Sequence, residues 1–366
     1  MINTEKYKIA TKFLQKLNQN KIIPGLERIR TLMNLLGNPQ NELEIITVGG
    51  TNAKGSTCYS LSKTLMQTGG NIGCFTSPHL HSVRERIKIN NQNIDPNTFG
   101  EYILKIKELA NDNNIQITYF EMLTAVAYLY FKEEKVDYAI MEIGLGGEWD
   151  AVNVGNAQIA ILTTLGQDHT EYLGHNLEDI AKTKAKIVRK DSIVITGWDE
   201  KYHKYIPQSS KLIKGNSIEE WITNCVKCLN LSIVTQMCSV PGRLERYTNF
   251  TLDTAHNVQA IKHILENENN YQKIILGMLQ DKDIENFICE LPNNSVILGC
   301  DLNTERSTSS ENIANLCRKA KLSCKKFESV EKAIKSIKNE NTLITGSFYT
   351  VSEARTHFKL EGYSEL

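Results

Sequence analysis

The chain has 366 residues, which is more than the roughly 250–300 that one hydrophobic core usually serves, so its length predicts two domains. Its 42 basic and 42 acidic residues cancel, and this balance excludes a general affinity for nucleic acid or anionic lipid. The start lacks the features of a secretory signal, and no apolar run is long enough to span a membrane. Nine scattered cysteines are typical of reduced thiols, so we expect a cytoplasmic protein without membrane or nucleic-acid partners.

Short β-branched runs alternate with longer helical segments, which is the pattern of a parallel α/β sheet. In the first half, the predicted strands are 43–48, 71–75, 138–143, 157–164 and 193–197, and the predicted helices are 56–67, 120–132 and 177–189. In the second half, the predicted strands are 251–253, 273–276, 295–298 and 343–345, and the predicted helices are 258–266, 283–290, 310–320 and 330–338. The stretch 197–241 is polar and irregular apart from a helix at 218–229. We therefore predict domains at 1–239 and 240–366.

Within that polar stretch, Cys225 and Cys228 have the C-x-x-C spacing of a zinc site, and Cys238 follows them. A structural zinc site normally needs a second ligand pair. The sequence has no matching pair, so we interpret these cysteines as core thiols.

A glycine-rich segment lies between the first predicted strand and the next helix. It reads Gly49-Gly50-Thr51-Asn52-Ala53-Lys54-Gly55-Ser56-Thr57. Such a turn brings backbone N–H groups and a helix N-terminus to phosphate oxygens, while a lysine adds positive charge and hydroxyls reach magnesium. Alanine replaces the usual glycine before the lysine, and it costs about 1 kcal/mol if that position needs a positive φ. The segment predicts a nucleotide-phosphate site.

This loop resembles the G-T-N-G-K-G-S loop of folylpolyglutamate and dihydrofolate synthases, within the Mur ligase superfamily. Further segments match that family in the expected order, and they are 25–28, 36–40, 75–80, 85–87, 120–125, 142–147, 166–169, 184–185, 241–245, 253–257, 277–283 and 345–347. The resemblance implies a P-loop-containing, Mur-ligase-like central domain with a parallel sheet. A smaller Rossmann-like α/β domain with the family's glutamate ligase role is expected to follow it.

A metal site is predicted at the end of one central strand. Glu142 ends that strand, at the edge where α/β sheets bind ligands, and a buried carboxylate there needs a cation. Magnesium prefers oxygen ligands, which Glu142 and Ser77 supply. The resemblance adds His169 and a carboxylated Lys184, whose carbamate would hold a second magnesium. Taken alone, Lys184 fits a solvated helix face and His169 a loop histidine.

The resemblance also implies the remaining site residues. It assigns ATP binding to Gly50, Thr51, Asn52, Lys54, Gly55, Ser56, Thr57, Asn257 and Arg306. It assigns substrate binding to Ser77, Pro78, His79, Leu80, Asp253 and His256, and catalysis to Lys54, Glu142, His169 and Lys184. By themselves, the polar residues of the second domain favour caps or turns.

The implied reaction is the ATP-dependent ligation of L-glutamate to dihydropteroate, to tetrahydrofolate or to its polyglutamates. It runs through an acyl phosphate and releases ADP and phosphate, with magnesium as cofactor and small molecules as the partners of a monomer. Glu148-Trp149 stands where the family has Arg-Leu, and Thr254 and Val258 replace a glycine and a proline. These departures leave open a degenerate ligase that only binds nucleotide.

Two further alternatives fit the sequence less well. A Mur-type ligase acting on another carboxylate usually carries an extra N-terminal domain, but this chain reaches its phosphate loop by residue 50. A switch GTPase needs an Asn-Lys-x-Asp segment to read its base, and the sequence has none.

Overall fold

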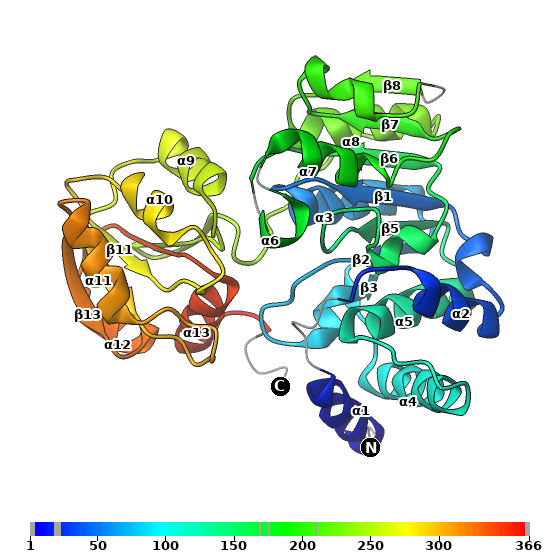
Figure 1. Ribbon diagram of the computed structural model, residues 1–366, viewed down its shortest axis with the longest axis horizontal. Coiled ribbons are helices and arrows are strands. Elements are labelled where there is room, and N and C mark those ends of the chain that lie inside the picture. The colour runs from blue at the N-terminus through cyan, green and yellow to red at the C-terminus, as the bar shows by residue number, and fades with distance from the viewer. Residues whose placement is uncertain (1–3, 18–22, 168–169, 175, 209–210, 363–366) are drawn as a thin grey trace. The chain divides into compact units, whose positions relative to one another are not determined.

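The computed structural model describes residues 4–17, 23–167, 170–174, 176–208 and 211–362, and within them the chain forms two compact units. The first unit comprises Met1–Pro78, Val83–Gly166 and Leu173–Cys238. The second comprises His79–Ser82, Gln167–Tyr172 and Ser239–Leu366. Each unit is an α/β fold with its own sheet, which confirms the predicted fold class (Figure 1).

The first unit is built on an eight-stranded sheet of order β4-β3-β2-β5-β1-β6-β7-β8. Its strands are β1 (Ile45–Gly49), β2 (Ile72–Phe75), β3 (Ile87–Ile89), β4 (Gln92–Asn93), β5 (Tyr138–Glu142), β6 (Ile159–Leu162), β7 (Ile193–Thr196) and β8 (Lys211–Lys214). Strands β3 and β4 form an antiparallel edge, and the other six run parallel. The carboxyl ends of β5, β1 and β6 therefore meet at one edge of the sheet.

Helices cover both faces of this sheet, which is why its strands are continuous apolar runs. Up to residue 238 the helices are α1 (Thr4–Lys16), α2 (Glu27–Leu35), α3 (Lys54–Leu65), α4 (Pro96–Asp112), α5 (Tyr119–Glu133), α6 (Thr170–Leu173), α7 (Leu177–Ala185) and α8 (Ile218–Cys228). Short 3-10 turns lie at Pro39–Glu42, Met66–Thr68, Val83–Arg86, Ala151–Val154 and Glu200–Tyr205. Ile46 and Val48 of β1 pack in one core with α3 and α8, whereas Ile45 packs in the other with α5 and α7.

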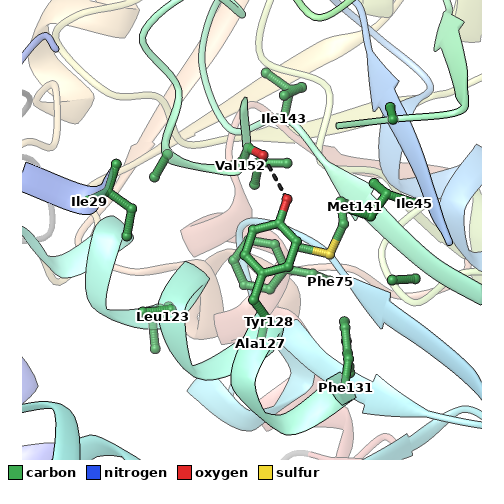
Figure 2. Close-up of a cluster of buried hydrophobic side chains, with 14 of the residues drawn as sticks. Ile29, Ile45, Phe75, Leu123, Ala127, Tyr128, Phe131, Met141, Ile143 and Val152 are labelled. Carbon is green, nitrogen blue, oxygen red and sulfur yellow. Dashed lines mark hydrogen bonds between the residues drawn. The ribbon is translucent and has the colours of Figure 1, made fainter. Parts of the chain in front are cut away.

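The core on the α5 face also buries a polar group that is satisfied. Tyr128 of α5 is fully buried, and its hydroxyl donates a hydrogen bond of 2.7 Å to the carbonyl of Val152 (Figure 2). Phe75, Met141 and Ile45 surround its ring (Figure 2). Because the hydroxyl has a partner, its burial carries no unsatisfied donor.

The second unit has a six-stranded sheet of order β13-β12-β11-β14-β10-β9. Its strands are β9 (Glu245–Tyr247), β10 (Phe250–Leu252), β11 (Lys273–Leu276), β12 (Val296–Cys300), β13 (Ser323–Phe327) and β14 (Thr342–Thr345), and only β9 is antiparallel to its neighbour. Its helices are α9 (Val258–Asn267), α10 (Ile284–Cys289), α11 (Ser310–Lys319), α12 (Val330–Lys335) and α13 (Phe348–Phe358). Residues of α9, α10 and α11 share one core and residues of α12 and α13 another, so this sheet too is covered on both faces.

The structure corrects parts of the predicted element map. The stretch 197–241 is not irregular outside its helix, because β8 adds an edge strand to the first sheet. The helix predicted at 177–189 ends at Ala185, although Ile187 and Val188 beyond it are still buried. Other helices and strands that we did not predict are α1, α2, α4, α6, α13, β3, β4, β9 and β13. Among the described residues, no helix is long and apolar enough to cross a membrane.

Candidate active site

The phosphate loop lies between β1 and α3 and has two residues with positive φ. Gly50 has φ 140°, and a Cβ on it would lie 1.9 Å from Oγ1 of Thr163, so no larger residue fits. Ala53 has φ 67° and caps α3, so the predicted strain of about 1 kcal/mol applies to it. Helix α3 then begins at Lys54, with its first backbone N–H groups free of intrahelical partners. That geometry suits an anion.

Threonines after β6 hold this loop in place. The Thr163 hydroxyl donates to the carbonyl oxygens of Gly49 and Asn52, at 3.1 and 2.8 Å. The Thr164 hydroxyl accepts from the Asn52 N–H at 3.0 Å, and that of Thr51 bonds to Gly166. We did not predict a role for Thr163 and Thr164. A pair of hydroxyl residues directly after a strand beside β1 is the signal that could have found them.

Two lysines donate to carbonyl groups of the loop. Nζ of Lys54 lies 3.0 Å from the carbonyl oxygen of Thr51. Nζ of Lys184, from α7, lies 2.8 Å from that of Gly50, and its residue is only 5% exposed. The interpretation of Lys184 as part of a solvated face is therefore wrong, whereas Lys182 on the same helix has a side chain that is 53% exposed. The loop thus has one partly buried and one buried ammonium group against its backbone.

Glu142 lies on the neighbouring strand, beside the start of α3. It pairs with Val48 in the register of β5 and β1 and is 3% exposed. Its Oε2 accepts the backbone N–H of Ser77 at 2.9 Å. A Cβ on Gly55 would lie 3.7 Å from the same oxygen, so the first turn of α3 faces the carboxylate. Burial, together with the charge of Glu142, raises the pKa of the Cys58 thiol well above its usual value.

A second buried carboxylate follows the glycine run after β5. Asp150 accepts the backbone N–H of Leu145 at 2.8 Å and that of Val152 at 3.0 Å, which fixes the loop between them. Burial raises the pKa of Asp150 to about 7, although these N–H groups and Lys54 favour the charged form. In the same loop Trp149 is 55% exposed. We did not predict a role for Asp150; its place after the glycine run that follows a predicted strand was the available signal.

The site residues predicted after position 240 fall into two places. Asp253 is buried and accepts the N–H groups of Leu244 and Ala255, each at 2.8 Å, and burial raises its pKa. Asn257 caps α9 by accepting the Ala260 N–H, and a ring nitrogen of His256 lies 2.9 Å from the Thr254 carbonyl oxygen. These three residues thus share one turn.

Arg306 lies elsewhere, in the loop between β12 and α11, where it forms an ion pair of 2.7 Å with Asp281. Burial alone raises the pKa of Asp281, but the hydrogen bond and charge of Arg306, with the charge of Lys282, lower it below its ordinary value.

The predicted substrate loop is divided between the two units. Ser77 and Pro78 belong to the first, whereas His79 and Leu80 belong to the second, where Leu80 packs against the core of α12 and α13. Asp168 and His169 lie outside the described residues. Within the described part of the chain, no group of three or more His, Cys, Asp or Glu side chains is arranged to hold a metal ion.

A glycine-rich phosphate loop on a central parallel strand, followed by a second α/β unit, defines a two-domain phosphate-loop protein. Two protein-family models match this chain and identify the family to which it belongs. The Mur ligase middle domain matches residues 48–220, and the Mur ligase glutamate ligase domain matches residues 242–347. The chain therefore belongs to the Mur ligase family.

Curated relatives and a solved structure show which members of the family this chain is similar to. The dihydrofolate synthase/folylpolyglutamate synthase of Escherichia coli K12 is 27% identical over 93% of this chain and 92% of its own. The dihydrofolate synthetase of Saccharomyces cerevisiae is 40% identical over 45% of this chain, but the match spans only 39% of the yeast protein, and a match with a Haloferax volcanii relative spans 23% of that protein. The bifunctional folylpolyglutamate synthase/dihydrofolate synthase of Yersinia pestis CO92 aligns with a TM-score of 0.85 and 25% identity, over 97% of this chain and 98% of its own.

Proposed function

We propose that this protein is an ATP-dependent acid–amino-acid ligase that joins L-glutamate to dihydropteroate and to reduced folates. The names of its full-length relatives support this dual activity. One observation on the chain itself carries the proposal: a buried carboxylate, Glu142, faces the first turn of a phosphate-loop helix. A site that transfers a phosphoryl group needs this pairing of an anion cradle with a cation-binding oxygen.

The chemistry starts from an unreactive carboxylate. Transfer of the γ-phosphoryl group of ATP converts the substrate carboxylate into an acyl phosphate, which has a good leaving group. The amine of glutamate then attacks the carbonyl carbon, and the tetrahedral intermediate collapses to the amide and phosphate. The protein contributes mainly by positioning these groups and neutralising charge.

The phosphate loop does the positioning of the nucleotide in this proposal. The N–H groups of 54–56, in the first turn of α3, cradle the phosphate oxygens, and Lys54 exchanges its bond to the Thr51 carbonyl for one to the β- and γ-phosphates. Thr163 and Thr164 keep the loop in its binding conformation, because they already satisfy the carbonyl and N–H groups of Asn52. The loop therefore needs little reorganisation when ATP binds.

The residues around Glu142 fit a divalent cation. Glu142 and the Ser77 hydroxyl offer oxygen donors of the kind that magnesium prefers, and Gly55 leaves space beside the carboxylate. When bound there, magnesium would neutralise charge on the phosphates. A relative from Yersinia pestis has been solved with AMPPNP and a manganese ion, which supports a divalent metal. We propose that His169 and a carboxylated Lys184 serve a second position; Lys184 is already buried against the loop.

The remaining assignments rest on the family alone. We propose that 1–239 and 240–366 are the functional domains, that Asn257 and Arg306 contact ATP, and that Asp253 and His256 complete the site. We also propose that 77–80 hold the substrate carboxylate. For Arg306 this requires that its bond to Asp281 breaks or is shared when the nucleotide binds.

The test is ADP release by the purified chain with ATP, magnesium and L-glutamate, offering dihydropteroate or tetrahydrofolate as acceptor. Turnover with both acceptors is the expected result, and turnover with dihydropteroate alone would restrict the function to dihydrofolate synthesis. Lys54→Ala should abolish turnover, whereas Lys63→Ala, an exposed lysine on the same helix, should not. Nucleotide binding by a folded chain without turnover on either acceptor would favour the degenerate ligase.

A further inference from the structure

Two cysteines meet where α11 turns into β13. Cys317 lies in the last turn of α11 and is fully buried, and Cys324 is the second residue of β13. The Leu322 N–H donates to the Cys317 carbonyl at 2.9 Å, which closes the turn and brings the two residues onto the same side. The Cys324 thiol donates to the Lys325 carbonyl at 3.7 Å, and the two thiols lie close enough for each to shift the pKa of the other. The site described above uses neither residue.

The neighbouring strand β12 shows on which face of the sheet the Cys324 sulfur lies. A Cβ on Gly299 of β12 would lie 3.6 Å from that sulfur and 2.9 Å from Cγ2 of Ile313 on α11. Both cysteines therefore lie on the sheet face that α11 covers, and they pack in the same core. Yet β13 is the edge strand of the sheet, and Cys324 is partly exposed. A small reagent can therefore reach Cys324, whereas Cys317 is buried in the core and is not accessible to it.

The two thiols differ in acidity. The polar contact with the Cys317 thiol lowers the pKa of Cys324 to about 7; burial opposes this and the Gly299 N–H assists it. The same contact, together with burial, raises the pKa of Cys317. Burial likewise raises the pKa of Cys225 and Cys300. At pH 7 about half of Cys324 is therefore thiolate, and the thiolate is the form that reacts with oxidants.

We propose that Cys317 and Cys324 form a thiol-modification site at which a peroxide closes a reversible intramolecular disulfide. The Cys324 thiolate attacks one oxygen of hydrogen peroxide, the O–O bond breaks, and a sulfenic acid and hydroxide form. The Cys317 thiol then attacks the Cys324 sulfur, the S–O bond breaks, and water leaves as the disulfide forms. Two thiols are oxidised, the peroxide is reduced to two waters, and a dithiol reductant restores the pair. The inference is independent of the proposed ligase activity.

Trypsin makes the test direct, because it cleaves between the two cysteines at Arg318, Lys319 and Lys321. The purified full chain is treated with a small excess of hydrogen peroxide, alkylated, digested and analysed by mass spectrometry without reduction. The expected product joins peptides 307–318 and 322–325, and it disappears after reduction. A Cys289→Ser background removes an exposed thiol that would otherwise compete for oxidant.

Two variants separate the roles of the thiols. Cys324→Ser should lose the linked peptide, and Cys317→Ala should leave a sulfenic acid on Cys324. In Cys317→Ala the alkylation of Cys324 at pH 7 should also slow about three- to fivefold, because less thiolate is present, although each thiolate is more nucleophilic. Unchanged alkylation in that variant would overturn the proposal, and so would peroxide-treated wild type that shows no 317–324 link. Alkylation reports on Cys324 even if one variant is less stable.

Discussion

Replacing Ala53 by glycine should stabilise the first unit, which is the opposite of what this substitution does in a helix. Ala53 has φ 67°, and an alanine in this left-handed region costs roughly 1–2 kcal/mol that glycine avoids. Two terms oppose the gain. Glycine makes the unfolded chain more flexible, which costs roughly 0.4–1 kcal/mol. The Ala53 methyl also packs against the core of α3 and α8, and its loss costs a few tenths, on the order of 0.5 kcal/mol.

The sum predicts that Ala53→Gly raises the free energy of unfolding by about 0.5 kcal/mol. The matched control is Ala110→Gly, a buried position within α4, where the same change should lower it by about 1 kcal/mol or more. Urea unfolding followed by tryptophan fluorescence suits this comparison. The three tryptophans, Trp149, Trp198 and Trp221, all lie in the first unit, so the signal reports on that unit.

The test compares the free energies of unfolding of the two variants, which should differ by about 1.5 kcal/mol. Unfolding midpoints resolve a difference of this size well when both variants have the same denaturant slope. A fall in stability in Ala53→Gly equal to that in Ala110→Gly would refute the reasoning, since it would mean that position 53 is not left-handed in solution. A rise combined with retained ADP release would show that the strained alanine is not itself needed for catalysis.

Three further changes test other parts of the chain. Lys184→Ala should abolish turnover. After incubation with ¹³C-bicarbonate, the carbamate carbon signal in the NMR spectrum should be present in wild type and in the Lys182→Ala control but absent from Lys184→Ala. A fully active Lys184→Ala would contradict the proposed role of Lys184. Burial raises the pKa of Asp150 from an ordinary 3.8 to about 7 in the folded state, so between these pH values the folded chain binds a proton that the unfolded chain has lost. The free energy of unfolding should therefore fall as the pH rises through this window, by on the order of 2 kcal/mol between pH 5 and 8. Asp150→Asn cannot titrate, so its unfolding free energy should lack this component; an identical pH dependence in both proteins would assign it to other groups. Arg28→Ala should destabilise the first unit by about 2 kcal/mol, because it leaves the buried Glu121 carboxylate without its 3.1 Å ion pair. Arg30→Ala, at an exposed site on the same helix, should change stability little, and equal losses would show that the ion pair contributes nothing.

The sequence determined the central elements because their signals are local. Strands buried on both faces must be continuous apolar runs, so β1, β5 and β11 were predicted to within two residues at each end. The phosphate loop was equally readable, since glycines beside a lysine have a direct conformational and electrostatic meaning. These local patterns also placed Glu142 at the correct strand end.

Only the tertiary structure decided the elements whose stability comes from a neighbour. Strands β8 and β13 carry lysines at positions that face solvent, and they form because an existing sheet edge offers them hydrogen bonds. In the site, the burial of Lys184 was likewise decided only by the tertiary structure. Its helix is rich in lysine and gives no local sign of burial, yet the fold brings its ammonium group 2.8 Å from the Gly50 carbonyl. A contact between residues that are far apart in the chain has no signature in either local sequence, so the fold alone sets it.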